Sequence, residues 1–110
     1  QSDYFAEPGD HAGEMETSVM LHVAPDLVRP LSEAGDGRAR PFRIEALQED
    51  WAWAEREWPR VTDDTGVGNP AAASAEKGKA YLDRVTEAVA HLLRDLAAAD
   101  LDDLYAERDA

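Results

Sequence analysis

One short stretch near the start of the chain concentrates the carboxylate and imidazole side chains that could do chemistry. Directly before an apolar run at residues 19–23 stand four ionisable residues, Asp10, His11, Glu14 and Glu16. Positions 11 and 16 lie about 140° apart around a helix, so their side chains could not converge from one regular helix. They can meet if His11 lies in a loop and Glu16 in the helix that follows. We therefore expect any chemistry to be located here.

Apolar periodicity predicts a helix over residues 13–24, with Asp10 as its N-cap and Pro25 as its stop. Glu16 is expected to point toward the core with the apolar residues, whereas Glu14 is expected on the surface. A carboxylate in the core is costly unless it is paired, hydrogen-bonded or bound to a metal. The predicted core face of this helix consists of Met15, Glu16, Val19, Met20 and Val23.

The middle of the chain gives weaker signals. Residues 27–41 contain turn residues and are expected to be a connecting region, followed by a short strand at residues 42–44. Residues 51–54, Trp-Ala-Trp-Ala, fit a strand or a helix equally well, and the three tryptophans are expected in the core. Residues 62–70 are dense in turn residues and are expected to be a loop.

A long amphipathic helix is predicted over residues 75–98, with Ser74 as its N-cap. Its apolar stripe is expected to be buried against a partner. Residues 100–110 are expected to form a short helix or a fraying tail. His22 and His91 are expected on the surface of the two helices.

Length and charge limit the classes of function. A chain of 110 residues makes one domain at most or part of one, and the sequence begins like a segment of something longer. The net charge of −13 argues against nucleic acid or an anionic membrane as partner. No apolar run approaches the roughly 18 residues of a membrane span. Cysteine is absent, which excludes disulfides and is compatible with a cytoplasmic setting.

Two blocks of the sequence resemble one known family. Residues 9–18, Gly-Asp-His-Ala-Gly-Glu-Met-Glu-Thr-Ser, are similar to the His-Ala-Gly-x-x-Glu-Thr-Ser signature of the creatininase (creatinine amidohydrolase) family. Residues 65–70, Thr-Gly-Val-Gly-Asn-Pro, with residues 73–78 after them, resemble that family's glycine–proline loop and helix start. The resemblance spans nearly all of this chain but only the C-terminal part of the family's domain.

The resemblance implies a three-layer α/β/α fold, of which residues 1–110 would be the C-terminal portion, mostly helical with one or two short strands. It also implies hydrolysis of a C–N bond in a cyclic or linear amide, assisted by two divalent metal ions, zinc or manganese. Glu16 matches a metal ligand of the family. His11 matches the histidine that transfers a proton near the substrate. Asp10 stands at an acidic position next to it and is expected to bind substrate.

The family's other metal ligands, a Glu-x-His pair, an aspartate and a Gly-His-Gly-type histidine, have no match in this chain. The chain alone is therefore expected to be inactive without an N-terminal portion, and to expose an apolar patch. Glu7 and Pro8 stand where creatinine-specific members carry a tryptophan, which favours another small amide as substrate. The resemblance further implies a homo-oligomer.

Two alternatives stay open at this point. The chain could be a non-catalytic interaction module derived from the same fold. It could also belong to a peptidase-like or deformylating member of the family.

Overall fold

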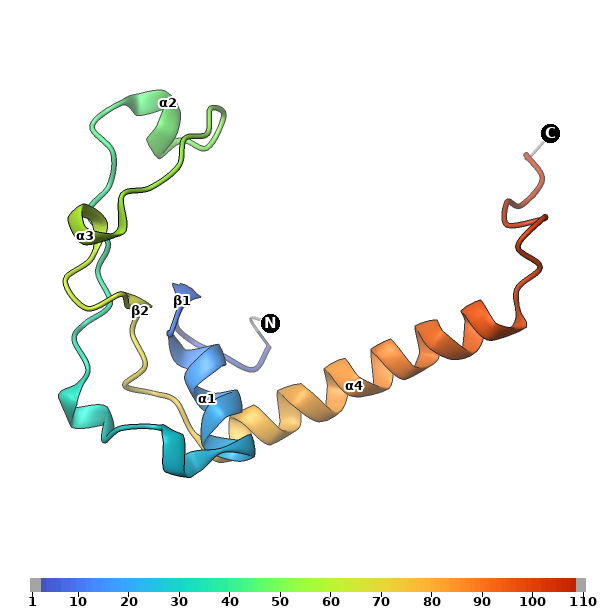
Figure 1. Ribbon diagram of the computed structural model, residues 1–110, viewed down its shortest axis with the longest axis horizontal. Helices are drawn as coiled ribbons and strands as arrows, with labels where there is room; N and C mark the ends of the chain where they lie inside the picture. Colours follow the sequence, from blue (N-terminus) through green and yellow to red (C-terminus); the bar gives the residue numbers. More distant parts are fainter. Residues whose placement is uncertain (1–2, 109–110) are drawn as a thin grey trace.

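The structure is a computed structural model that describes residues 3–108, and much of the chain between its helices is irregular (Figure 1). Helix dominates, and within the described residues the sheet has two short strands. No helix in residues 3–108 is long and apolar enough to cross a membrane. In chain order the elements are β1 (Gly9–His11), α1 (Glu14–Val23), two 3-10 turns (Pro25–Leu27 and Leu31–Glu33), α2 (Glu45–Gln48), α3 (Trp58–Val61), β2 (Val67–Gly68) and α4 (Ala75–Ala98).

Helices α1 and α4 cross with almost no side chain between them. Gly78 of α4 faces the backbone of Ser18, and a methyl group at Gly78 would lie 1.9 Å from the Ser18 carbonyl oxygen. The Ser18 hydroxyl is fully buried and accepts a hydrogen bond from the Ser74 backbone N–H at 3.1 Å. Glu14, one turn before Ser18, is also fully buried. The inner face of α1 is therefore small and polar.

The predicted bounds of the first helix are confirmed to within a residue, but its predicted core face is wrong. Glu16 is exposed, and so are the apolar side chains of Met20 and Val23. The close approach of α4 explains the difference, because a crossing at a glycine selects a small residue such as Ser18 over a methionine or valine. Asp10 is not the N-cap either: it lies in β1, and Gly13 occupies the N-cap position without a side-chain bond.

Glycines bring three segments together beside α1. Strands β1 and β2 are antiparallel, with Gly9 opposite Gly68 and His11 opposite Val67. Gly68 has a φ of +132°, and a Cβ there would lie 2.7 Å from the Gly9 Cα. Its N–H donates to the Gly37 carbonyl at 2.8 Å. The two blocks of sequence that carry the family resemblance thus lie side by side.

Helix α4 begins and ends where the sequence predicts. Ser74 is its N-cap, and the Ser74 hydroxyl accepts the Lys77 N–H at 3.2 Å. Its first turns pack on α1, and Tyr81 packs edge-on against Phe5 with ring centroids 5.2 Å apart. The rest of α4 extends away from the remainder of the chain (Figure 1). The expected exposed apolar patch is present, and it consists of Val85, Val89, Leu92, Leu93 and Leu96.

The middle of the chain differs from its predictions. Residues 42–44 form no strand, and residues 51–54 form neither a strand nor a helix. A strand needs a neighbour to pair its backbone groups, and no other strand of the described residues runs beside these segments. The side chains of Trp51 and Trp53 are exposed rather than in the core. Residues 100–108 form a turn and irregular chain, without a helix.

Candidate functional site

The signature loop, residues 9–13, comprises β1 and the tight turn that joins β1 to α1. Ala12 sits at its apex with a positive φ of 54°. The Glu16 carboxylate reaches back from the first turn of α1 and accepts the Ala12 backbone N–H at 2.5 Å. The Thr17 hydroxyl donates to the Ala12 carbonyl oxygen at 3.2 Å. The sequence predicts that Asp10 satisfies a backbone donor ahead of the helix. In the structure the Glu16 carboxylate accepts from such a donor instead.

The orientation of the His11 ring is set by the second block of the resemblance. Its Nδ1 lies 2.7 Å from the backbone carbonyl oxygen of Thr65. A carbonyl oxygen only accepts, so Nδ1 carries the hydrogen and the neutral ring keeps a lone pair on Nε2. The ring is exposed and packs against Trp58, with ring centroids 5.3 Å apart. His11 is therefore held in one tautomer with Nε2 available to exchange a proton.

Asp10 forms an ion pair with an arginine that the sequence did not single out. Its Oδ2 lies 2.6 Å from Nη1 of Arg56. The Arg56 guanidinium also lies over the Trp58 ring, with Cζ 4.7 Å from the ring centroid. No local pattern links position 10 to position 56, because the contact depends on how the long middle segment folds back.

The three residues chosen from sequence line one small cavity. Asp10, His11 and Glu16 border a space of about 30 Å³. That volume is enough for a water molecule. The remaining lining residues are Glu7, Gly9, Gly13 and Met15.

The buried carboxylate of this region is Glu14, which was expected on the surface. Its Oε1 lies 2.8 Å from Nζ of Lys77, and its Oε2 accepts the Glu7 backbone N–H at 2.8 Å. The Lys77 ammonium also donates to the Ala72 carbonyl at 2.7 Å. The ammonium group of Lys77, with the Glu7 N–H, holds the pKa of Glu14 below its usual value of 4.5 despite burial. This pair ties the segment before β1 to the starts of α1 and α4.

We expect Lys77→Met to lower the free energy of unfolding at pH 7 by roughly 2–4 kcal/mol, because it leaves a buried carboxylate unpaired. The native pair stabilises the fold above the ordinary pKa of a glutamate, and its contribution is lost as pH falls through the depressed folded-state pKa. Acid should therefore destabilise the native protein more steeply than the variant. Chemical denaturation at pH 7 and in steps down to about pH 3 measures both effects, because the contribution is lost below the ordinary pKa of a glutamate.

Lys79→Met is the matched control. Lys79 pairs with Asp83 at 2.5 Å on the exposed side of α4, and such surface pairs contribute little. A change of less than about 0.5 kcal/mol is expected. Equal losses in the two variants would contradict a special role for the buried pair.

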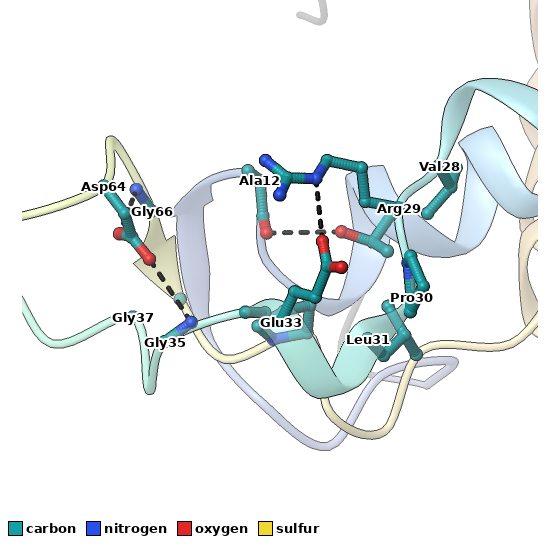
Figure 2. Close-up of a pocket in the computed structure, with 14 residues that line it drawn as sticks. Ala12, Val28, Arg29, Pro30, Leu31, Glu33, Gly35, Gly37, Asp64 and Gly66 are labelled. Atoms are coloured by element: carbon teal, nitrogen blue, oxygen red, sulfur yellow. Dashed lines mark hydrogen bonds and ion pairs between the residues drawn. The ribbon is translucent and has the colours of Figure 1, made fainter.

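A second, larger cavity borders the signature loop at Ala12 (Figure 2). It measures about 270 Å³ and is bordered by Ala12 and Thr17. The Asp64 carboxylate at its edge accepts the Gly66 N–H at 3.0 Å and the Gly35 N–H at 3.3 Å. These two backbone N–H groups hold the pKa of Asp64 below its usual range, and the Gly66 N–H has the larger effect. None of Asp10, His11 and Glu16 lines this cavity.

The described residues do not form a metal cage by themselves. No group of three or more histidine, cysteine, aspartate or glutamate side chains within residues 3–108 is arranged to hold a metal ion. Glu16 fits the part of a single ligand, because only its Oε2 is engaged in the Ala12 bond. Further ligands would have to come from outside these residues.

Comparison with known proteins identifies the family. The family model for creatinine amidohydrolase matches residues 1–93. Among solved structures, a protein of Bacteroides fragilis NCTC 9343 that carries a provisional creatinine amidohydrolase name is 50% identical, with a TM-score of 0.85. The match covers 91% of this chain and 40% of that one. No curated protein matches significantly. The chain belongs to the creatininase family, and the expected resemblance is confirmed.

Proposed function

We propose that this chain is part of a metal-dependent amidohydrolase that cleaves a C–N bond of a small cyclic or linear amide. The observation that carries the proposal is the His11 geometry. Nδ1 is engaged by the Thr65 carbonyl at 2.7 Å, which leaves Nε2 as a proton acceptor. The His11 residue also lines a cavity that can hold a water molecule. Membership of the creatinine amidohydrolase family supports the class of reaction.

His11 then acts as the general acid and base. Its Nε2 accepts a proton as water attacks the amide carbonyl, and returns it to the nitrogen as the C–N bond breaks. The Thr65 carbonyl stabilises the imidazolium formed in between, because Nδ1–H is already hydrogen-bonded to it. The ring keeps its orientation through both steps, which an unrestrained exposed histidine would not.

Glu16 is proposed as one ligand of the two divalent metal ions, zinc or manganese, that the family match suggests. When bound, these ions would polarise the amide carbonyl and lower the pKa of a bound water. Asp10 is proposed to bind the substrate, with Oδ2 held by Arg56 and the other oxygen left to accept a hydrogen bond. Asp10 and Glu16 are both exposed, and both border the cavity that His11 lines.

We further propose that residues 1–110 are the C-terminal portion of a three-layer α/β/α domain whose other layers and ligands lie in an N-terminal portion. The 40% coverage of the Bacteroides fragilis protein supports this arrangement. In it, the exposed stripe of α4 would pack on a sheet larger than the two short strands of residues 3–108, and intact copies would form a homo-oligomer. The acidic surface disfavours nucleic acids and anionic membranes as partners, and a cytoplasmic setting fits the absence of cysteine.

An interaction module is the second candidate function, and the apolar stripe of α4 favours it. Exposed patches of this kind commonly mark a protein interface. A peptidase-like or deformylating activity of the same site is a variant of the first proposal. Hydrolysis of a small amide by the natural protein would exclude the module, and the identity of the best substrate would separate the enzymatic variants.

We expect Glu16→Gln to lower the divalent metal content of the complete natural protein, because a neutral amide is a poorer ligand than a carboxylate. Metal analysis after dialysis against zinc or manganese measures the stoichiometry. Glu76→Gln is the control, since Glu76 is exposed in the first turn of α4. An unchanged metal stoichiometry in Glu16→Gln would contradict the assignment of Glu16 as a metal ligand.

A further inference from the structure

We propose that Arg56 and Trp58 are positioning residues that fix the imidazole of His11, a role that rests on the acid and base function proposed above. Neither residue belongs to the two blocks that carry the family resemblance. The contacts that place them form a ring of side chains beginning and ending on adjacent residues of β1, namely Asp10, Arg56, Trp58 and His11.

One hydrogen bond is too little to hold the His11 ring. On an exposed ring this single contact, from Nδ1 to the Thr65 carbonyl, would open if the ring turned about its side-chain torsions, so a packed neighbour is needed to keep it closed. Trp58 supplies a second constraint, because its indole lies 5.3 Å from the imidazole, centroid to centroid, at an interplanar angle of 58°. An imidazole packed on a large ring loses the rotamers that this ring occupies.

Trp58 needs support of its own, because it begins the short helix α3 and its side chain is partly exposed. The Arg56 guanidinium provides that support by lying 4.7 Å from the indole centroid. Arg56 is in turn anchored by its 2.6 Å ion pair with Asp10. A planar guanidinium can stack on an indole and pair with a carboxylate at once, which a lysine ammonium cannot do as well.

The same contacts also govern the charge beside His11. Arg56 neutralises the Asp10 carboxylate, the residue next to His11 in the chain. Losing Arg56 would therefore both free the indole and leave an uncompensated carboxylate near the imidazole. A displacement of about 1 Å in a proton-transferring group can cost about 100-fold in rate, so modest disorder of the ring would be visible in turnover.

The direct test is ¹⁵N NMR of the imidazole nitrogens in histidine-labelled protein, without added substrate or metal, with His11→Gln used to assign the signals. We expect the native protein to show His11 as a single Nδ1–H tautomer. Trp58→Leu and Arg56→Met should each give a mixture of tautomers, and Trp58→Phe should restore the single form. Trp53→Leu, which removes an equally large but 86% exposed side chain, should change nothing.

A single Nδ1–H tautomer with unshifted signals in both Trp58→Leu and Arg56→Met would overturn the proposal. Turnover of the complete protein separates this proposal from the function on which it rests. If Trp58 positions the His11 ring as proposed, Trp58→Leu should lower kcat by about 10- to 100-fold and change KM by less than about twofold. A tautomer shift without loss of kcat would support positioning and count against the acid and base role. A loss of kcat without a tautomer shift would overturn positioning.

Discussion

His11→Gln is expected to lower the rate of amide hydrolysis by about 10²- to 10⁴-fold, the usual contribution of general acid and base catalysis. Glutamine is similar in size and can keep a hydrogen bond to the Thr65 carbonyl, but it cannot accept and return a proton. Stability should change by no more than about 1 kcal/mol, because His11 is exposed and contributes one side-chain hydrogen bond. Steady-state kinetics on the complete protein measures the first effect, and thermal unfolding measures the second.

His22→Gln is the matched control for this prediction. His22 is exposed in the last turn of α1 and lies outside the small cavity that His11 lines. Its substitution should leave both rate and stability unchanged. If His11→Gln retained native turnover while binding its metals normally, the assignment of His11 as the proton-transferring group would be wrong.

Gly78→Ala should lower the free energy of unfolding by about 2–3 kcal/mol, within the range measured for overpacked contacts. At an exposed helical position the same change would instead stabilise by about 1 kcal/mol, because alanine is the better helix former. The opposite sign is expected here because the new methyl group would lie 1.9 Å from the Ser18 carbonyl oxygen and 2.8 Å from the Val19 nitrogen. Both neighbours are backbone atoms, so α1 and α4 must move apart.

Ala88→Gly provides the comparison within α4, since Ala88 is exposed and its substitution should cost only the propensity difference of about 1 kcal/mol. Chemical denaturation of both variants measures the two values. A stabilised Gly78→Ala protein would contradict the close crossing. Separation of the helices should also break the Ser74–Ser18 hydrogen bond, which amide exchange at Ser74 would report.

The two longest helices, α1 and α4, follow from local signals in the sequence, and that is why their bounds were predictable. The one-turn helices α2 and α3 were not predicted. Ser74 caps α4 through its own hydroxyl, and the apolar repeat continues to the end of that helix. Pro25 stops α1 as expected. The two strands were missed because they have only three and two residues and are built on glycines. Their pairing depends on the close approach of Gly9 and Gly68, and no alternation of apolar and polar residues predicts that approach.

The proximity of Asp10, His11 and Glu16 was predictable from the sequence, but their detailed geometry was not. Asp10, His11 and Glu16 line one cavity, yet Glu16 is exposed and the buried acid is Glu14. The spacing of the apolar residues in α1 predicted the wrong core face, because α4 packs against a different face of α1, which carries small and polar residues. Burial of Glu14 depends on Lys77, 63 positions further on, and no short-range sequence pattern indicates a pair at that separation.

Hydrolysis of a panel of small cyclic and linear amides by the complete natural protein tests the central claim most directly, measured as ring opening for the cyclic amides and as release of amine or ammonia for the linear ones. The account predicts hydrolysis of at least one such amide, lost on chelation, restored by zinc or manganese, and lowered about 10²- to 10⁴-fold by His11→Gln. Absence of hydrolysis across the panel by the metal-loaded protein, or hydrolysis that survives both chelation and His11→Gln, would contradict it.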